Sequence, residues 1–425
     1  MAFPGLSCRP QGTIIVSHLP PASAFELDRS HAWPMADTDQ PTVRMVRHAD
    51  LTADDRARWA ALSAHAAAAN VFAQDWFMDA ALRHAADGRD AMLAVVSHHS
   101  GTWLGVMPLV TASRFGRWPA RIWRGWSTTS QFLGMPLVAA QSAGMFWASL
   151  LAFLDRQASG EILLHFGAFD ADDPISIALL DRCSHEGRAF HIIHRFNRPA
   201  YRVGDDAADR NDAKVRSRLR SLLRRIERDH GSVAITIFDP TQPCTSWIDA
   251  FLEMEASGWK GRNGSALGSA PETEALFRTV IERGHENGSA RLASLSVNGR
   301  VIAMSSWFES PSWGHGFKMT FDEEYRAYAP GQLLMREISD RIGRRADMSF
   351  DTCVPRDASN SHRLWPNNRR IIDGAVAIGS PRQRFHFDML MKARAGMAAA
   401  KACIAKAQNR LAFNGRIDEA VKPAL

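Results

Sequence analysis

The residues that most suggest chemistry lie in the stretch KMTFDEEYRAYAPGQLLMREI, residues 318–338. Pro330 suits the first position of a helix, because the N–H that proline lacks would be unpaired there. Gly331 has no Cβ, so a ligand can come close, and Leu334 and Ile338 follow at helical spacing. The N–H groups at the start of such a helix could bind a pyrophosphate, whereas an ordinary turn that leads into a helix explains the same letters without a ligand.

Two basic segments also have more than one interpretation. The stretch 214–231, KVRSRLRSLLRRIERDHG, predicts a helix with one apolar stripe and an arginine-rich remainder. That remainder could bind nucleic acid or an anionic membrane, or it could be a solvated face of a connecting helix. In the stretch 114–126, arginines alternate with Trp118, Trp123 and Trp126; these could hold a sugar or a base, but a hairpin with its tryptophans packed inward explains the spacing equally well.

The composition limits the class of protein that must position these residues. With 425 residues, of which 46% are hydrophobic and 23% charged, the chain has room for two globular domains. Its longest apolar run, residues 144–154, is shorter than the roughly 20 residues that a membrane-spanning helix needs. The five cysteines show no CxxC spacing, so we expect neither a disulfide framework nor a metal site, and a cytoplasmic location. The net charge of +6 agrees with an acidic ligand.

The chain is expected to begin with a loose segment and to continue as an α/β protein. Residues 1–40 are rich in proline and predict a flexible tail, with Met35 as an alternative start. Strand and helix patterns then alternate through 41–205 and again through 206–385. The expected strands are 42–48, 92–98, 103–111, 161–166, 190–195, 200–203, 233–238, 290–297, 300–308 and 313–321, and the expected helices are 54–67, 75–86, 141–157, 174–186, 246–257 and 272–286.

Three motifs in the second region resemble those of the CelD-like branch of the GNAT acetyltransferases. The family patterns are similar to W-K-G-x-x-G-x-A, K-x-x-[YF]-D-x-x-Y-x-x-x-[SA]-P-G-x-L-L and D-F-G-x-G-x-x-x-Y-K-x-x-W. In this chain they correspond to 259–266, 318–334 and 351–365. The third motif departs from the pattern: Thr352 and Pro355 stand where glycines are expected, and His362-Arg363 replaces Tyr-Lys. This departure bears on the acceptor chemistry more than on the fold.

The resemblance implies two tandem GNAT-like α/β domains with mixed sheets, an arrangement also similar to that of the Fem peptidoglycan transferases. Residues 41–205 would form the first domain, without a coenzyme site because they show no Pro-Gly-x-Leu-Leu pattern. The basic helix would join it to the second domain, 206–385, which would bind acyl-CoA. Residues 386–425 would form a C-terminal helix and tail.

The resemblance also implies roles for single residues. Acyl-CoA, with acetyl-CoA first, would be the co-substrate, and no metal would take part. The coenzyme would contact the loop and the helix start at Tyr328, Pro330, Gly331, Gln332 and Leu333. The acceptor would be contacted by Trp259, Lys260, Lys318 and Trp365.

Acyl transfer from a thioester needs a group that takes a proton from the acceptor. The candidate bases are Asp351, Glu255 and Asp322, in that order, and Tyr325 could donate a proton to the leaving thiolate. Each of these residues could instead be a helix cap, a surface partner or a packed side chain.

The implied function is the transfer of an acyl group, acetyl first, to an amine or hydroxyl acceptor. Because CelD-like proteins are associated with exopolysaccharide and cellulose biosynthesis, the acceptor could be a small molecule, a sugar or a polysaccharide precursor. Two alternatives remain: a Fem-like transferase that uses aminoacyl-tRNA, with the basic helix on RNA phosphates, and a non-catalytic scaffold of the same fold. The sequence assigns no oligomeric state.

Overall fold

The computed structural model of the protein describes residues 41–204, 213–355, 363–365 and 367–420, with side chains up to residue 404 except that of Ala402. The predicted N-terminal tail, the alternative start at Met35 and the motif residue His362 lie outside these residues.

The described chain is a mixed α/β fold, as predicted, and it runs through similar elements twice. Each half contains a strand, two helices, three antiparallel strands, a helix and a further strand. The first half comprises β1 (Thr42–Arg47), α1 (Ala53–Ala64), α2 (Asp75–His84), β2 (Met92–Ser97), β3 (Trp103–Phe115), β4 (Trp118–Gly125), β5 (Leu137–Val138), α3 (Ala143–Gln157), β6 (Leu163–Asp170), α4 (Pro174–His185) and β7 (Phe190–Tyr201).

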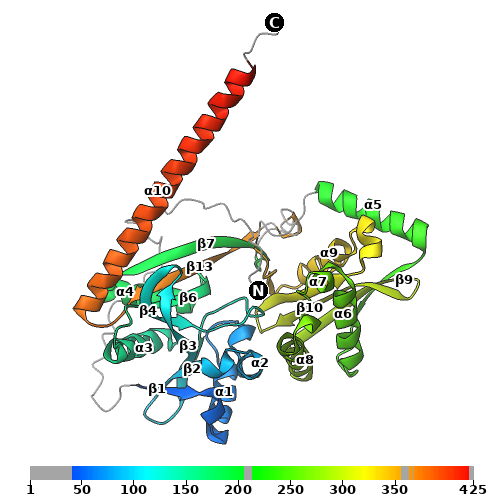
Figure 1. Ribbon diagram of the computed structural model, residues 1–425. Coiled ribbons are helices and arrows are strands. Elements are labelled where there is room, and N and C mark those ends of the chain that lie inside the picture. Colours follow the sequence, from blue (N-terminus) through cyan, green and yellow to red (C-terminus); the bar gives the residue numbers. More distant parts are fainter. Residues whose placement is uncertain (1–40, 205–212, 356–362, 366, 421–425) are drawn as a thin grey trace.

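The second half has the longer list of elements. It comprises α5 (Ala213–His230), β8 (Val233–Ile237), α6 (Thr245–Ser257), the short α7 (Trp259–Arg262), α8 (Pro271–Glu286), β9 (Ala290–Val297), β10 (Arg300–Glu309), β11 (Trp313–Phe321), the 3-10 helix η7 (Glu323–Tyr328), α9 (Pro330–Ile342), β12 (Ser349–Asp351) and β13 (Asn367–Ala377). Helix α10 (Pro381–Ala420) follows and projects from the body as a single rod (Figure 1).

One continuous sheet joins the halves because their last strands are exchanged. Its order is β1-β2-β3-β4-β6-β13-β7-β12-β11-β10-β9-β8, with β5 paired to β3. Strand β13 comes from the end of the second half, yet it lies between β6 and β7 of the first. The end of β7 in turn pairs with β12 of the second half. The two halves therefore complete each other's sheet.

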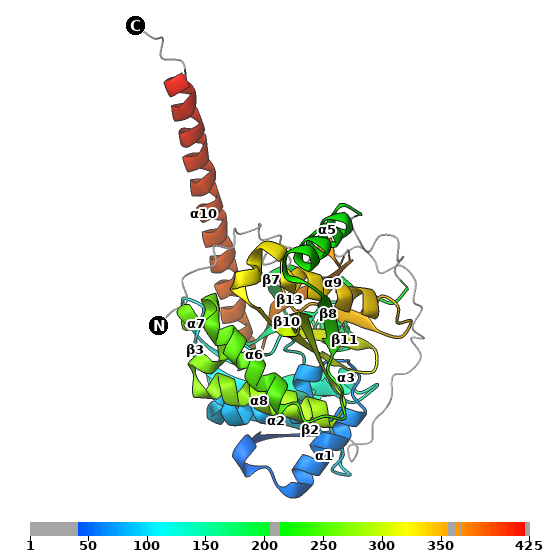
Figure 2. The ribbon, with the colours of Figure 1, turned by 90° about the vertical axis from the view of Figure 1, so that its right-hand side faces the viewer.

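Helices cover the sheet in both halves (Figures 1 and 2). One large core cluster includes residues of both halves, such as Phe77 of α2 and Phe308 of β10, whose rings lie 5.8 Å apart. A second cluster joins α5 and α9 to the second half of the sheet. The apolar stripe predicted on α5 is confirmed, because Val215, Leu219 and Ile226 are buried.

Most predicted elements are confirmed to within a few residues. Asn298 and Gly299 have φ angles of 45° and 82°, as the predicted β9–β10 turn requires. Strands β3 and β4 form the predicted hairpin, in which Trp126 is buried and the arginines point outward. One expectation is wrong: the two strands expected at 190–195 and 200–203 are one strand, β7, because its long pairing with β13 continues through Pro199.

No helix of the described residues has the length and apolar character to cross a bilayer. No group of three or more His, Cys, Asp or Glu side chains is arranged there to hold a metal ion.

Candidate functional site

The sheet of the second half opens between its two parallel strands. Strand β12 pairs with β11 only from Trp313 to His315, and no other strand of the described residues lies on that side of β11 up to Phe321. A shift in the register with β10 marks a bulge beside Phe317. Lys318 and Met319 follow the bulge, in the part of β11 that β12 does not reach.

Helix α9 begins beside the same part of β11. Ala329, the residue before the helix, has a left-handed backbone with φ of 51°. Its carbonyl accepts hydrogen bonds from the N–H groups of Gln332 and Leu333, at 2.9 and 3.1 Å. Among the described residues, no acceptor pairs with the N–H of Gly331. At this helix start, that N–H is therefore free to bind a ligand.

Gly331 faces a different neighbour from the one we expected. A Cβ built on it would lie 3.0 Å from the Sδ of Met319 and 3.7 Å from the ring of Phe321. A side chain at this position would thus press on β11 rather than project toward a phosphate. The glycine lets α9 lie close to β11. A substitution at Gly331 would therefore affect a ligand by moving the helix.

Tyr328 connects the loop before α9 to the end of α5. Its hydroxyl lies 3.0 Å from a carboxylate oxygen of Asp229 and 3.0 Å from Nε2 of His230. The guanidinium of Arg225 lies over the tyrosine ring, 5.2 Å from its centre. These contacts fix the position of the loop, and the hydroxyl of Tyr328 is already hydrogen-bonded within the protein.

On the opposite face of the sheet from α9, Glu255 of α6 is buried and doubly bound. One carboxylate oxygen lies 2.6 Å from Nζ of Lys260, and the other accepts the N–H of Leu267 at 2.7 Å. Lys260 also donates to the carbonyl of Met319 at 3.3 Å. The family motif around Lys260 therefore ties α6 and α7 to the strand that carries Lys318.

Lys318 has an ammonium group in unusual surroundings for a charged group. Its ammonium lies 5.3 Å from the ring centre of Phe317 and 5.5 Å from that of Phe132, which belongs to the first half. Burial, with the positive charge of Lys260 nearby, lowers the pKa of Lys318 to about 8. No hydrogen bond or carboxylate within salt-bridge distance holds this ammonium among the described residues, so it is available to a negatively charged or carbonyl group of a ligand.

Asp351 lies in a buried polar network at the seam of the halves. Its carboxylate lies 3.5 Å from Arg198 of β7 and 3.2 Å from Arg369 of β13. Arg369 also donates to Asp170 of β6 at 2.7 Å. Although burial alone would raise the pKa of the Asp351 carboxyl, the two arginines outweigh it and hold that pKa below its usual range. His315 lies in the same network, 3.3 Å from Arg369.

Asp322 and Tyr325 occupy the outer side of the loop. Asp322 caps η7 through the N–H of Glu324 at 3.0 Å and pairs with Arg300 at 2.6 Å. The guanidinium of Arg300 lies 5.5 Å from the ring centre of Tyr325, and the ring of His230 lies 5.1 Å from it. Both residues thus belong to the surface of the loop that leads into α9.

The two tryptophans predicted to bind the acceptor differ in exposure. Trp259 is 49% exposed at the start of α7, and its backbone N–H donates to Glu323 at 3.0 Å. Trp365 is buried and stacks on Phe350 with ring centres 4.8 Å apart. Trp259 is therefore accessible to a ligand, whereas Trp365 packs beneath β12.

Three residues of this region escaped the sequence analysis. Phe132 comes from the first half, and its loop carries no pattern that points to Lys318. His230 and Asp229 stand at the end of the basic helix, where the arginines dominate the pattern. The pairing of Tyr328 with them joins segments 98 and 99 residues apart, which no local spacing indicates.

The first half has no such opening, because a loop fills the equivalent gap beside its parallel strands. Strands β4 and β6 pair at Trp123 and Arg124, and the chain then turns along β6. The N–H of Gly134 donates to the carbonyl of Ala168 at 3.1 Å. A Cβ on Gly134 would come within 2.3 Å of the carbonyl of Gly167, so only glycine fits there.

The second half matches a known family. Residues 213–358 match a family model described as an acetyltransferase (GNAT) domain. This segment runs from α5 past β12 and contains the opening, the start of α9 and Lys318. No curated protein matches the chain in sequence.

Solved structures resemble much of the chain distantly. A conserved protein of unknown function from Bacteroides thetaiotaomicron is 13% identical with a TM-score of 0.48, over 77% of this chain and 98% of its own. FemX is 10% identical with a TM-score of 0.47, over 75% and 95%. L-PGS from Bacillus licheniformis is 12% identical with a TM-score of 0.46, over 80% and 96%. All three scores lie below 0.5, so these likenesses carry no argument about activity.

Proposed function

We propose that the protein transfers an acyl group, acetyl first, from acyl-CoA to an amine or hydroxyl acceptor. The observation that carries this proposal is the content of the segment 213–358, which matches the GNAT family. In this segment the start of α9 and the unpaired ammonium of Lys318 flank the opening in the sheet. A helix start suits the phosphates of a coenzyme, and a cation suits a carbonyl that gains negative charge.

The coenzyme would lie along the start of α9. Its phosphates would be held at Gly331, Gln332 and Leu333, with Pro330 and Tyr328 forming the wall of the loop. The N–H of Gly331 supplies a free donor there, and the positive end of the helix dipole favours negative charge.

Lys318 would stabilise the oxygen of the thioester carbonyl as the acceptor attacks. A preorganised positive charge in a partly buried site stabilises a developing oxyanion more than water does. We propose Glu255 as the proton acceptor because its charge acts on Lys318. It would have to exchange its contact with Lys260 or with the N–H of Leu267 for the acceptor. Asp351 is bound by two arginines and Asp322 by a third, so we assign them structural roles.

The acceptor would enter from the side of the first half. Phe132 brings that half to Lys318, and the exposed Trp259 offers an aromatic face for a sugar ring. We therefore propose a saccharide or another small molecule as the acceptor, as in CelD-like proteins. Tyr325 remains our candidate donor to the leaving thiolate. The proposal places the protein in the cytoplasm, where acyl-CoA is available.

Calorimetric titration with acetyl-CoA tests binding, and release of free thiol on a panel of amino sugars, other amines and alcohols tests transfer. We expect saturable binding and thiol release that depends on one class of acceptor. Absence of binding would overturn the proposal. Binding without thiol release on any acceptor would favour the scaffold alternative.

A second candidate, aminoacyl transfer from tRNA, is favoured by one observation. Helix α5 presents Arg218, Arg220 and Arg224 to solvent beside the loop that carries Tyr328. Such a face could bind RNA phosphates, and the binding would weaken steeply with salt. Salt-dependent binding of aminoacyl-tRNA together with no binding of acetyl-CoA would replace our proposal with this one.

A further inference from the structure

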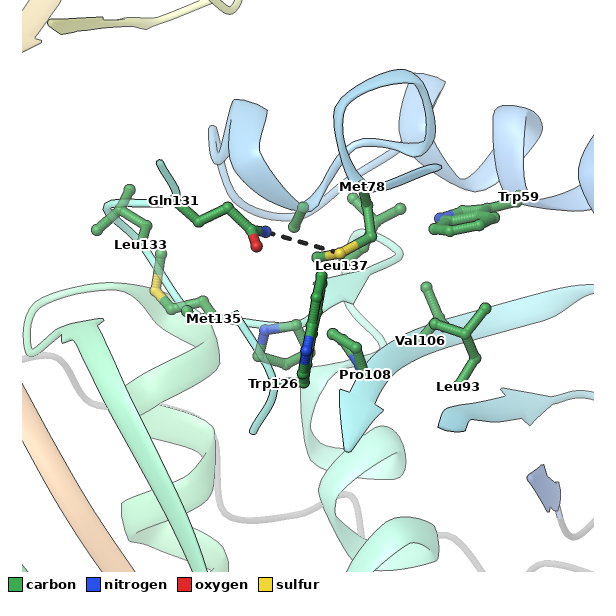
Figure 3. Close-up of a pocket in the computed structure, with 13 residues that line it drawn as sticks. Trp59, Met78, Leu93, Val106, Pro108, Trp126, Gln131, Leu133, Met135 and Leu137 are labelled. Carbon is green, nitrogen blue, oxygen red and sulfur yellow. Dashed lines mark hydrogen bonds between the residues drawn. The ribbon is translucent and has the colours of Figure 1, made fainter. Parts of the chain in front are cut away.

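A pocket lies inside the first half, between α1, α2, β2 and β3, and residues 126–137 close one side of it (Figure 3). About 10 Å³ of it is wide enough for the centre of a water molecule, so the pocket as it stands has room for about one water. We call it the indole pocket, because Trp59 and Trp126 line it.

The two tryptophans bring buried donors that the protein does not use. Trp59 is 1% exposed and Trp126 is 3% exposed. Neither indole N–H has an acceptor within the described residues. An indole can only donate, and buried donors are nearly always paired in folded proteins. Each N–H can therefore donate to an acceptor atom that comes from outside the chain.

The other polar side chain at the pocket is already satisfied. Gln131 donates its amide N–H to the carbonyl of Phe72 at 2.9 Å, and its amide oxygen accepts the N–H of Thr128 at 2.9 Å. A ligand thus finds two free donors and no free side-chain acceptor. The complementary group is an oxygen that accepts hydrogen bonds, such as a carbonyl, an ether or a hydroxyl used as an acceptor.

The lining also sets the charge and shape of an occupant. All of its residues are uncharged, so an ionic group would lose its hydration without gaining a partner. The walls are aromatic and aliphatic, which suits a ring or a short apolar chain. Met78 and Met135 line the pocket, and their sulfurs accept hydrogen bonds from Gln131 at 3.6 Å and from Ser176 at 3.9 Å. An occupant larger than water requires these two flexible side chains to move.

One wall of the pocket separates it from Lys318. Gln131 and Leu133 line the pocket, whereas Phe132 between them lies against Phe72 and below the ammonium of Lys318. The indole pocket is therefore distinct from the opening at β11, and binding in it requires neither acyl-CoA nor the start of α9.

We propose that the indole pocket is a binding site for a neutral, mostly apolar ring or short chain that carries an acceptor oxygen. The oxygen pairs with the indole N–H groups of Trp59 and Trp126, and the apolar part fills the space between Met78 and Met135.

Cyclohexanone is a suitable probe, with cyclohexylamine and cyclohexanecarboxylate as charged analogues of the same size. The indole N–H signals of the full chain, observed in ¹H–¹⁵N NMR spectra during titration, report the contact directly. Trp247 is the matched control, because its N–H is also buried and unpaired but does not line the pocket. Substitutions Trp59→Phe, Trp126→Phe and Trp247→Phe assign the three signals.

We expect cyclohexanone to move the Trp59 and Trp126 signals saturably and to leave Trp247 in place, while the charged analogues move none of them. Trp59→Phe and Trp126→Phe should each weaken binding about two- to tenfold, the effect of one lost hydrogen bond, and Trp247→Phe should not. Absence of a saturable shift, equal shifts at Trp247, or equal binding of the charged analogues would overturn the proposal. The spectrum of the unaltered chain decides even where a variant fails to fold.

Discussion

The two halves share an order of elements but use the gap beside their parallel strands differently. In the first half the chain from 126 to 136 fills the gap, with Gly134 bonded to Ala168 of β6. In the second half the gap stays open, and Lys318 and the start of α9 lie at its mouth. The same scaffold thus gives one half whose gap is filled by its own chain and one half whose gap stays open.

The surroundings of the two gaps differ in charge as well as in shape. The first half has a neutral pocket with two unused indole donors. The second has an ammonium whose pKa is lowered to about 8, mainly by burial. Our proposal therefore places the anionic coenzyme in the second half.

The largest effect should come from the seam that joins the halves. Replacing Asp351 by asparagine leaves Arg198 and Arg369 without their shared carboxylate. Breaking a buried ion pair in this way should lower the free energy of unfolding by about 3–5 kcal/mol. Urea denaturation followed by circular dichroism measures it.

Asp347→Asn is the control for that change. Asp347 is exposed and pairs with Arg345, so its loss should cost less than about 1 kcal/mol. If Asp351→Asn keeps the stability of the unaltered protein but loses transfer activity, Asp351 is a base and the seam is not what holds the halves together.

Lys318→Met tests whether the chemistry resides in the second half. Methionine fills a similar volume without the charge, and the loss of an oxyanion-stabilising group should reduce kcat/KM by about 10²–10³-fold. Trp126→Phe is the matched change in the first half and should leave kcat/KM with small amines within about threefold of the unaltered value. Equal losses of kcat/KM in Lys318→Met and Trp126→Phe would show that the chemistry does not reside in the second half alone.

The pH dependence sharpens the role of Lys318. Its proposed active form is the ammonium, and its pKa is about 8, so with a hydroxyl acceptor, which does not titrate in this range, kcat/KM should be level below pH 7 and fall about tenfold per unit above pH 8. Arginine stays charged through this pH range, so the residual kcat/KM of Lys318→Arg should not fall above pH 8. A rate that rises from pH 7 to 9 would instead make the neutral amine the active form.

Gly331→Val tests the close approach of α9 to β11. The new side chain meets Met319, so the helix start should shift and acetyl-CoA binding should weaken at least about tenfold, or 1.4 kcal/mol. Gly144→Val at the start of α3 is the control in the first half, because no atom lies within 4 Å of its Cβ position. Calorimetry on both variants measures the affinities.

A compensating change follows from the same contact. Met319→Ala removes the sulfur that the valine meets, so the double variant should regain part of the lost affinity. If folded Gly331→Val binds acetyl-CoA as the unaltered protein does, the start of α9 is an ordinary helix start.

The smallest effect is expected on α5. Arg220 and Arg224 are exposed and lie off its apolar stripe, so replacing both by glutamine should change the free energy of unfolding by less than about 0.5 kcal/mol. Acetyl-CoA binding should also remain. A drop in transfer with unchanged coenzyme affinity would show that the acceptor contacts this arginine face.

Local patterns were sufficient for most of the fold. Periodicity located the hairpin at Asn298 and Gly299, the buried stripe of α5 and the helix that starts at Pro330, because each depends on neighbours within a few residues. The exchange of β13 into the first half could not be predicted this way, since it pairs residues about 200 positions apart.

The candidate site was predictable only in part, for the same reason. Spacing indicated Gly331 but not the direction of its missing side chain, which depends on Met319 of another element. Asp351 looked like a candidate base, and its enclosure by Arg198 and Arg369 appears only when β7 and β13 come together. Lys318 acquires its lowered pKa from burial that involves Phe132 of the other half.

The central claim is that acyl-CoA binds at the opening of the second half and not at the filled gap of the first. Hydrogen exchange of the full chain with and without acetyl-CoA, read by mass spectrometry, tests it most directly, because bound ligand slows local opening. We predict slower exchange in peptides covering 316–334 and unchanged exchange in peptides covering 126–143. Protection of 126–143, or no protection of 316–334 at saturating acetyl-CoA, would contradict the account.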